Sequence, residues 1–429
     1  MDDQRMQVPR SLDGWLEYIE RIHPKSIELG LDRVREVKAR LGIALAVPVI
    51  AVGGTNGKGS TCAMLEAILL AAGYRVGMYT SPHLLRYNER VRVDGRPVGD
   101  DDLCQAFALV EAAREGVALT YFEFGTLAAW VIFARTCPEA LILEVGMGGR
   151  LDAVNAFDAD CAVVTSVGID HTEFLGNGRE EIGLEKAGIF RPGRPAIVAD
   201  PEPPASVVRH AMALGAGLQC IGKDFGYVSD RAQWTFWGPR GRRRGLAHPA
   251  LRGGCQLRNA SACLAALDGI ADRLPVDMTA VREGLAAVRW PGRFQVLPGR
   301  PTVVLDVAHN PQAAAALAQN LDEMGFYPAT HAVVGMLADK DMPGVCAAMK
   351  GRVSAWYAAT LGTRRGADAA GLAQAIRSAD AAAKVELFGS PQLAFAAACR
   401  RAVEDDRIIV FGSFYTVSDV MAALASPAS

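Results

Sequence analysis

The chain has 429 residues, half of them apolar, with 45 basic and 47 acidic residues and a net charge of −2. This length exceeds what one hydrophobic core usually fills, so two domains are expected. The balanced charge excludes a general field that would attract nucleic acid or an anionic membrane, so the expected partners are small molecules. The N-terminal segment MDDQRMQVPR lacks an apolar signal core, and no apolar run could span a bilayer. We therefore expect a cytoplasmic protein.

The first distinctive segment is Pro48–Leu70, which follows a stretch over Ser11–Leu41 with apolar residues at helical spacing. A β-branched run leads into a glycine-rich turn that holds Lys58, and apolar residues at helical spacing come next. This order predicts a strand, a phosphate-binding loop and a helix whose N-terminus faces a polyphosphate. The match to the pattern G-x-x-x-x-G-K-[ST] is imperfect because Gly59 separates Lys58 from Ser60. A purely structural glycine turn is the alternative.

A second strand is predicted over Arg75–Thr80, and it ends in Ser81 and His83. Ligands collect where the strands of an open parallel sheet end, so both side chains are candidates for a site. A plain turn before proline is the alternative role of the serine. Helices are then predicted over Asp100–Arg114 and Phe124–Ala134, with the segment LTYFE leading into the second of them.

The strand predicted over Ala140–Val145 is apolar except for Glu144. A carboxylate at the end of a buried strand is costly unless it is paired or bound to a cation, so beside a phosphate loop it indicates a Mg²⁺ ligand. A hydrogen-bonded or salt-bridged glutamate is the alternative. A further strand over Cys161–Val167 is followed by His171, which would lie at the same edge and is a second candidate ligand.

The helix predicted over Glu180–Gly188 places Lys186 among apolar residues. A partly buried lysine has a lowered pKa and can be chemically modified. Without further information, the sequence would make it the salt-bridge partner of Glu181, Glu185 or Glu144.

A strand is predicted over Ala196–Ala199, and the segment Phe225–Cys255 favours short hairpins. We expect four of its arginines to lie on a solvated tip, with nucleic-acid binding as the minor alternative: Arg240, Arg242, Arg243 and Arg244. Asn259 is predicted to begin an alanine-rich helix, and Trp290–Phe294 is predicted to be the domain junction.

After this junction strands and helices alternate again, which predicts a second α/β unit of about 130 residues. Strands are expected over Thr302–Val307, His331–Met336, Ala355–Thr360 and Arg407–Gly412, and helices over Gln312–Met324, from Val345, over Ala367–Ile376 and over Val417–Leu424. The first of these strands ends in the polar segment Asp306–Pro311. We therefore expect the active site in the cleft between the two domains.

The sequence resembles the folylpolyglutamate synthase and dihydrofolate synthase family of the Mur ligase superfamily. The resemblance covers nearly the whole chain, and it rests on motifs that occur in the family's order: GGTNGKGST, TSPHL, LTYFE, LEVGMGGRLDA, DHTEFLG, EKAGI, PGRFQ, DVAHNP and GSFYTVS. It implies an α/β protein with a P-loop ATPase-like domain over residues 1–296, built on a mainly parallel sheet, and a smaller Rossmann-like domain over residues 297–429. The glycine inserted after the lysine is a feature of this family.

The resemblance also implies roles for residues at matching positions. The ATP contacts would be Thr55, Asn56, Gly57, Lys58, Gly59, Ser60, Asn259, Arg293 and Asp306. Two Mg²⁺ ions would be held by Ser81, Glu144, His171 and Lys186, the last as a carbamate. The pterin would lie against Thr120, Tyr121, Phe122, Glu123, Leu151, Asp152 and Ala153. His309 and Ser413 are weaker candidates for binding glutamate, and a monomer is expected.

The implied activity is that of an ATP-dependent ligase that adds L-glutamate to dihydropteroate and to folates through an acyl phosphate. Lys58, Glu144, His171 and Lys186 would be its catalytic residues. Polyglutamylation of tetrahydrofolates alone is the alternative enzyme reading, and a nucleotide-binding protein with a decayed site is the alternative from another class. A cell-wall Mur ligase is disfavoured because no domain for a UDP-sugar precedes the phosphate loop.

Overall fold

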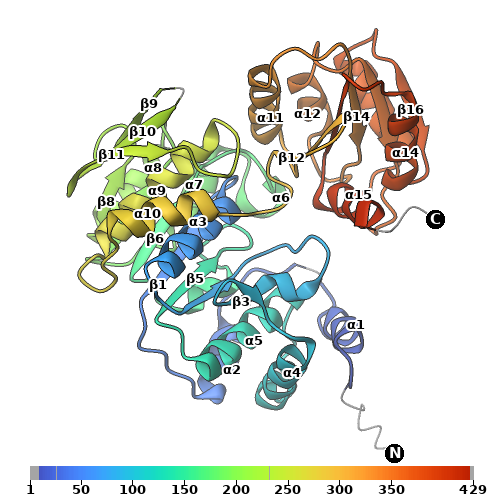
Figure 1. Cartoon of the computed structure of the whole chain (residues 1–429). Helices are drawn as coiled ribbons and strands as arrows, with labels where there is room; N and C mark the ends of the chain where they lie inside the picture. The colour runs from blue at the N-terminus through green and yellow to red at the C-terminus, as the bar shows by residue number, and fades with distance from the viewer. Residues whose placement is uncertain (1–8, 26, 231, 426–429) are drawn as a thin grey trace, which may run out of the picture.

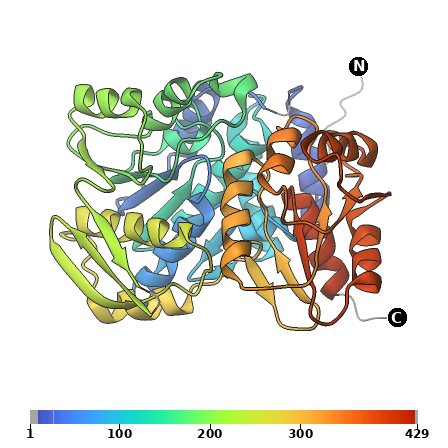
Figure 2. The same ribbon diagram turned by 90° about the horizontal axis from the view of Figure 1, so that it is seen from above.

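A computed structural model describes residues 9–25, 27–230 and 232–425, which form two α/β domains side by side (Figure 1 and Figure 2). Strands β1 to β11 belong to the N-terminal domain and strands β12 to β17 to the C-terminal domain. Within the described chain, no helix has the length and apolarity needed to cross a membrane.

The N-terminal domain is built on an eight-stranded sheet of order β4-β3-β2-β5-β1-β6-β7-β8. Its six strands from β2 to β8 in this order run parallel, and β3 and β4 add an antiparallel edge. The strands are β1 (Val49–Gly53), β2 (Val76–Tyr79), β3 (Val91–Val93), β4 (Arg96–Pro97), β5 (Ala140–Glu144), β6 (Cys161–Val164), β7 (Pro195–Val198) and β8 (Gly217–Cys220). Apart from Glu144 at the end of β5, the central strands are apolar, as suits a sheet whose two faces are both covered by helices.

One face of this sheet packs against α3 (Lys58–Ala71), α9 (Cys255–Gly269) and α10 (Met278–Ala287). The opposite face packs against α1 (Leu12–Ile22), α2 (Asp32–Leu41), α4 (Asp100–Arg114), α5 (Tyr121–Thr136), α7 (Arg179–Ala187) and α8 (Ala205–Leu214). The short helix α6 (Thr172–Leu175) follows β6. Because β1, β2, β5 and β6 are parallel, the loops after them meet at one edge, as the sequence predicts.

A separate three-stranded antiparallel sheet comprises β9 (Gly226–Ser229), β10 (Gln233–Gly238) and β11 (Gly241–Ala247). The predicted hairpins are therefore present, and three of the four arginines expected on a solvated tip are exposed, whereas Arg243 is partly buried. Arg243 is hydrogen-bonded to the buried carboxylate of Asp268, and Arg240 contacts Asp272 at 2.8 Å. These ion pairs fasten the hairpin to the end of α9.

The C-terminal domain has a six-stranded sheet of order β12-β13-β17-β14-β15-β16, in which only the pairing of β12 with β13 is antiparallel. Its strands are β12 (Gln295–Leu297), β13 (Thr302–Leu305), β14 (Thr330–Val334), β15 (Ala355–Ala359), β16 (Val385–Phe388) and β17 (Arg407–Phe411). Helices α11 (Pro311–Glu323), α12 (Met342–Ala348) and α13 (Ala369–Ala379) cover one face. Helices α14 (Pro391–Arg401) and α15 (Phe414–Ala425) cover the other.

Several element boundaries differ from the predicted ones. Helix α5 begins at Tyr121, three residues before the predicted start, because the Thr120 hydroxyl caps it by accepting a hydrogen bond from the Glu123 N–H. Helix α9 begins at Cys255, directly after two glycines, so Asn259 lies in its second turn. Strand β16 and helix α14 were not predicted; the strand is short and only partly buried.

Candidate active site

A cavity of about 1360 Å³ lies between the two domains. The N-terminal domain lines it with the loops after β1, β2, β5 and β6 and with the segment before α2. The C-terminal domain contributes the loops after β13, β14, β15 and β17. Every predicted site residue lines this cavity, so the structure gathers residues that are far apart in the sequence.

The phosphate loop connects β1 to α3 in a conformation that needs its glycines. Gly57 has a φ of 92°, and a Cβ at this position would lie 2.7 Å from Oδ1 of Asn259. Lys58 donates from Nζ to the carbonyl oxygens of Gly54 and Thr55 at 3.0 and 3.3 Å. The first N–H groups of α3 have no intrahelical partner, so they and Lys58 can receive a phosphate.

Thr55 and Asn56 are already engaged within the protein. The Thr55 hydroxyl donates to the Gly168 carbonyl and accepts from the Gly168 N–H. The N–H groups of Thr55 and Asn56 both donate to Ser166, to its carbonyl oxygen and its hydroxyl respectively. These bonds tie the phosphate loop to the loop after β6, which indicates that the two residues shape the loop rather than present free donors to a ligand.

The inserted glycine of the phosphate loop lies against the domain junction. A Cβ on Gly59 would lie 2.7 Å from Nε1 of Trp290 and 3.5 Å from a terminal nitrogen of Arg293. The position must therefore be glycine because the junction packs on it. The departure from the common phosphate-loop pattern thus has a steric cause in this fold.

Glu144 ends β5 with its side chain buried. Oε2 accepts a hydrogen bond from the Ser81 N–H at 2.9 Å, and no described residue forms an ion pair with the carboxylate. Burial raises the pKa of the Glu144 carboxyl, while the charge of Lys58 and the Ser81 N–H act in the opposite direction. A buried carboxylate with this little compensation fits a divalent cation as its partner.

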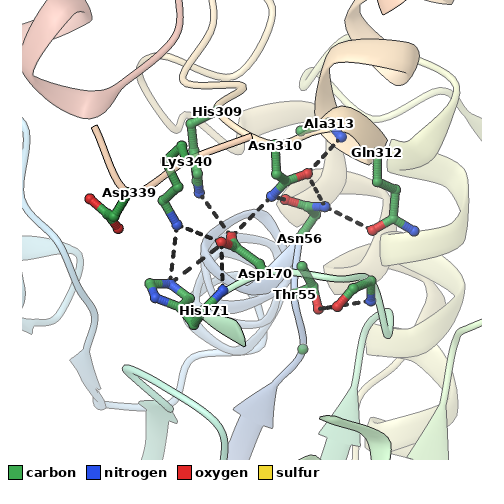
Figure 3. Close-up of polar contacts among 12 residues, drawn as sticks. Thr55, Asn56, Asp170, His171, His309, Asn310, Gln312, Ala313, Asp339 and Lys340 are labelled. Carbon is green, nitrogen blue, oxygen red and sulfur yellow. Dashed lines mark hydrogen bonds and ion pairs between the residues drawn. The ribbon is translucent and has the colours of Figure 1, made fainter. Parts of the chain in front are cut away.

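His171 belongs to a polar cluster at the boundary between the domains (Figure 3). Nε2 of His171 lies 3.5 Å from Nζ of Lys340, and Lys340 lies 2.5 Å from Oδ1 of Asp170. Nε2 of His309 is 3.4 Å from the other oxygen of Asp170. The ammonium group of Lys340 therefore shows that a cation is accommodated beside His171.

The charges of this cluster shift two pKa values. Burial alone would raise the pKa of Asp170, but the hydrogen bond from His309 and the charge of Lys340 hold it well below its usual range. Burial lowers the pKa of the His171 imidazole to about 4. The charge of Asp170 opposes this shift, and the charge of Lys340 adds to it. His171 is thus a neutral imidazole, the form that binds metals. It also adopts a left-handed backbone conformation, with a φ of 52°.

Asn56 joins the phosphate loop to the C-terminal domain (Figure 3). Its amide exchanges hydrogen bonds with Asn310 at 3.0 and 3.2 Å and donates to Gln312 at 2.9 Å. Asn310 also caps α11 and contacts Asp170. The start of α11 is therefore fixed against both the phosphate loop and the loop after β6.

Lys186 is buried in α7, and no hydrogen bond or ion pair of its ammonium group is present among the described residues. The expected salt bridges are absent there, because Glu185 pairs with Arg150 and Glu181 accepts from the Asn177 N–H. Burial, together with the positive charge of Lys58, lowers the pKa of Lys186 to about 7. A substantial fraction of this lysine is therefore a neutral, nucleophilic amine at neutral pH.

The residues expected to contact a pterin are held in defined positions. Glu123 accepts a hydrogen bond from the Thr120 N–H at 2.7 Å and forms an ion pair with Arg33 at 3.0 Å. Asp152 accepts from the N–H groups of Met147 and Val154. Burial raises the pKa of Asp152 to about 7 against these hydrogen bonds. The other predicted members of this wall also line the cavity: Tyr121, Phe122, Leu151 and Ala153.

The predicted contacts to the rest of a nucleotide come from both domains. Asn259 is buried in α9, and Arg293 stacks on Phe414, with its Cζ atom 4.9 Å from the ring centroid. Asp306 follows β13 and accepts from the N–H groups of Phe294 and Ala308, both at 2.8 Å. Burial lowers the pKa of Arg293 and raises that of Asp306, and each residue's charge opposes the shift of the other.

The two weaker candidates in the C-terminal domain differ in how far they are engaged. His309 bonds to the Val307 carbonyl through Nδ1 and faces Asp170 with Nε2. The buried hydroxyl of Ser413 accepts a hydrogen bond from the Thr416 N–H at 3.0 Å. It forms a second hydrogen bond with the Thr416 hydroxyl. The Ser413 hydroxyl thus caps the start of α15.

A loop after β2 connects the cavity to the core of the C-terminal domain. Ser81 starts this loop, and Glu89 holds it by accepting from the N–H groups of residues 84, 85 and 86. Leu84 packs against the C-terminal core that includes Val307 and Val417, and its carbonyl accepts from the Ser418 hydroxyl at 2.6 Å. The loop therefore contacts both domains.

Sequence reasoning assigned no role to Lys340, to Arg90 or to Asp170 of the DHTEFLG segment, and all three line the cavity. Lys340 follows β14, so the rule that polar residues gather after parallel strands would have found it. Arg90 precedes an antiparallel edge strand and offered no such signal. No three His, Cys, Asp or Glu side chains in residues 9–25, 27–230 and 232–425 gather closely enough to hold a metal ion by themselves.

Comparisons with known proteins cover both domains. Residues 52–211 match the Mur ligase middle domain, and residues 292–414 match the Mur ligase glutamate ligase domain. A dihydrofolate synthase/folylpolyglutamate synthase of Escherichia coli strain K12 is 45% identical over 97% of this chain and 96% of its own length.

Two solved structures resemble the whole chain. E. coli FolC in complex with DHPP and ADP has a TM-score of 0.93 and 45% identity, covering 97% of this chain and 98% of its own. A bifunctional folylpolyglutamate synthase/dihydrofolate synthase with Mn, AMPPNP and L-glutamate bound has a TM-score of 0.90 and 44% identity, covering 98% of this chain and 100% of its own.

Proposed function

Because this chain belongs to the dihydrofolate synthase/folylpolyglutamate synthase family of Mur ligases, we propose that it joins L-glutamate to dihydropteroate and to folates at the expense of ATP. The proposal rests on one cavity that is lined by the phosphate loop with Lys58, by the buried acid Glu144 and by the buried Lys186, which has no ion pair within the described chain. The structure of a relative with DHPP and ADP bound supports the same substrate classes.

ATP would lie with its phosphates at the start of α3. Lys58 and the free N–H groups of the helix would bind the phosphates, while Thr55 and Asn56 keep the loop in shape. Asn259, Arg293 and Asp306 would contact the remainder of the nucleotide. Since Asp306 belongs to the C-terminal domain, the bound nucleotide would touch both domains.

Ser81, Glu144 and His171 are the residues that would hold Mg²⁺, with Lys186 contributing as a carbamate. The relative that contains Mn and AMPPNP supports the use of a divalent cation with the nucleotide. Bound there, the cation would neutralise charge on the phosphates. The neutral amine of Lys186 fits carbamylation, since its nitrogen can bond to the carbon of CO₂ and release a proton. The product is an anion in place of an ammonium group that Lys58 repels.

The chemistry of an amide bond then assigns the reaction. A carboxylate resists attack by an amine until one of its oxygens becomes part of a good leaving group. Transfer of the γ-phosphoryl group of ATP to the acceptor carboxylate gives an acyl phosphate and ADP. The α-amino group of L-glutamate attacks the acyl carbon and phosphate leaves. Lys58 and the loop N–H groups would stabilise the charge on the phosphoryl group during transfer.

The contacts between the domains would protect the acyl phosphate from water. Asn56, Asp170 and Leu84 of the N-terminal domain are bound directly by residues of the C-terminal domain. A cavity closed in this way keeps the reactive intermediate away from bulk solvent. His309 and Ser413 remain our candidates in the C-terminal domain for contacts to glutamate, with Ser413 acting through the start of α15.

The proposal is tested by measuring phosphate release with ATP, Mg²⁺ and L-glutamate, using dihydropteroate or tetrahydrofolate as the acceptor. Turnover with both acceptors is expected. Release with tetrahydrofolate alone would leave only the polyglutamylating activity, and no glutamate-dependent turnover with either acceptor would favour a non-catalytic nucleotide-binding protein. Without L-glutamate, steady turnover is not expected, because the acyl phosphate has no amine to react with.

A further inference from the structure

Arg90 is a guanidinium in the cavity that forms no ion pair within the described chain, although its charge opposes the raised pKa of the buried Glu144 carboxyl. It lies at the end of a short helical turn over Tyr87–Arg90, and its side chain is partly buried. Its described side-chain hydrogen bond is from Nε to Nδ1 of His83 at 2.9 Å. The neighbouring Glu89 accepts backbone N–H groups with both carboxylate oxygens and forms no ion pair with Arg90 in the described chain.

Two other arginines that line the cavity are engaged: Arg365 pairs with Asp339 at 2.6 Å, and Arg293 stacks on Phe414. Arg252, Arg258 and Arg364 also line it without an ion pair in the described chain, but they lie in or near α9 and after β15 rather than beside the pterin wall. Arg90 has no carboxylate partner within the described chain, so its two terminal nitrogens retain four N–H donors. A partly buried guanidinium without an anion is costly, which indicates that an anion binds there when the cavity is filled.

Two aromatic rings fix the orientation of Arg90. Its Cζ atom lies 5.2 Å from the ring centroid of Tyr87 and 5.4 Å from that of Tyr121. These rings meet edge to face with their centroids 5.8 Å apart. Stacking of this kind holds the planar guanidinium in one orientation and reduces the entropy that binding an anion would cost.

The position of Arg90 relates it to both ends of the expected acceptor. Tyr121 is part of the wall against which we place the pterin. The carbonyl of Arg90 accepts a hydrogen bond from the Thr80 N–H at 2.9 Å. Ser81, which follows Thr80, donates its backbone N–H to Glu144. Arg90 thus lies between the pterin wall and the residues at which phosphoryl transfer is proposed.

The imidazole of His83 adds a second N–H donor beside Arg90. Because its Nδ1 accepts the hydrogen bond from Arg90, the ring proton of the neutral imidazole is on Nε2. This Nε2 has no hydrogen-bond partner in the described chain, and His83 lines the cavity. The pair therefore offers donors from two side chains in a fixed relative geometry.

We propose that Arg90 and His83 bind the carboxylate of the acceptor and hold it between the pterin wall and the phosphate loop. This inference rests on the proposed function and names the residues that select an acceptor with a carboxylate. The planar fork of arginine binds the two oxygens of a carboxylate in parallel. A neutral acceptor of the same shape would leave the guanidinium without its anion and would bind less tightly.

The test compares the binding of dihydropteroate and of its carboxamide, a neutral molecule of nearly the same size, in the absence of ATP. The wild-type protein should bind dihydropteroate at least about tenfold more tightly than the carboxamide, as expected for a charge-assisted hydrogen bond. Arg90→Gln should bind the two compounds equally and bind the carboxamide as the wild type does. Unchanged discrimination in Arg90→Gln, or none in the wild type, would overturn the proposal.

Two further variants separate binding from folding. Arg86→Gln is the matched control because Arg86 is exposed in the same loop and pairs with Asp100, away from the cavity. It should keep the wild-type discrimination. Arg90→Lys preserves the charge without the fork, so it should discriminate less than the wild type and more than Arg90→Gln. If Arg90→Gln does not fold, wild-type discrimination in a folded Arg90→Lys variant would refute the role of the fork.

This outcome is distinct from that of the proposed function. Discrimination between the two acceptors is read without ATP or glutamate, whereas the proposed function is read as glutamate-dependent phosphate release. A wild-type protein that discriminates but does not turn over would support the binding role of Arg90 and contradict the ligase activity. A wild-type protein that turns over but does not discriminate would support the ligase activity and contradict the binding role of Arg90.

Discussion

The ammonium group of Lys340 in the C-terminal domain lies 2.5 Å from the carboxylate of Asp170 in the N-terminal domain. Both side chains are nearly inaccessible, with 6% and 9% of their surfaces exposed. Asp170 precedes His171, so the pair connects the position of the C-terminal domain to a residue that we expect to bind Mg²⁺ (Figure 3). The arrangement of the domains and that of the metal site are therefore linked.

Lys340→Met is expected to loosen the contact between the domains. It leaves the Asp170 carboxylate buried without its main cation, and breaking a buried ion pair costs about 3–5 kcal/mol. A larger radius of gyration by small-angle X-ray scattering, together with a lower unfolding temperature, is the expected result. The double variant Lys340→Met/Asp170→Asn should recover much of the loss.

The matched control for this pair is Arg352→Gln. Arg352 pairs with Asp322 on the surface of the C-terminal domain, with 34% and 51% of the two side chains exposed. Such pairs contribute about 0–1 kcal/mol, so neither scattering nor unfolding should change appreciably. An unaltered domain arrangement in Lys340→Met would show that the ion pair does not hold the domains.

Lys186→Ala is expected to reduce turnover nearly to zero without reducing the free energy of unfolding. The lysine has no partner to lose among the described residues, and its charged form is disfavoured by burial. Phosphate release and thermal unfolding measure the two quantities, and a carbonyl signal from ¹³C-bicarbonate would report the carbamate in the wild type. Lys223→Ala, at an exposed position, is the control. Full activity of Lys186→Ala would remove this residue from the mechanism.

Gly59→Ser restores the hydroxyl that common phosphate loops carry after the lysine, yet it is expected to weaken ADP binding. The new Cβ would lie 2.7 Å from the Trp290 ring, so either the loop or the junction must move. Isothermal titration calorimetry with ADP measures the effect, since this readout does not depend on Trp290. Adding Trp290→Ala should recover part of the affinity by removing the clash. Wild-type affinity in the single variant would contradict the steric explanation.

Asp406→Asn is expected to destabilise the C-terminal domain at neutral pH. The carboxylate accepts from the N–H groups of Val403 and Ala329 and contacts His331, and leaving such buried groups unpaired costs about 1–3 kcal/mol. Burial alone would raise the pKa of Asp406, but these hydrogen bonds lower it below its usual value.

The sign of the pH dependence follows from this lowered pKa. The unfolded chain has the ordinary aspartate pKa of about 3.9, so the stabilisation is complete above that pH and is lost as the pH falls through the lower folded-state value. The difference in unfolding free energy between wild type and Asp406→Asn should therefore be constant from pH 7 to pH 5 and decrease below about pH 4. A difference that grows on acidification would contradict this assignment.

Much of the fold could be predicted because parallel strands buried on both faces have an apolar signature. The strand and loop around Lys58, and Glu144 at the end of β5, were located in this way. The rest depends on contacts between distant segments. Nothing in the local sequence shows that Trp290 packs on Gly59, that Lys340 reaches Asp170, or that the Thr120 hydroxyl starts α5 three residues early. Lys186 also shows that local sequence does not fix contacts, since it offers three acidic residues as partners and none of them pairs with Lys186 in the described structure.

The contact of Leu84 with the C-terminal core gives the molecule a target at the edge of the cavity, where the two domains meet. Ser81, at one end of the loop, contacts Glu144, while Leu84 fills a place beside Val307 and Val417. A small apolar inhibitor that occupied the place of Leu84 would separate the domains and displace Ser81 together with the loop. Because the proposed nucleotide also touches both domains, the compound and ATP would each weaken the binding of the other, so the potency of the compound would fall as the ATP concentration rises.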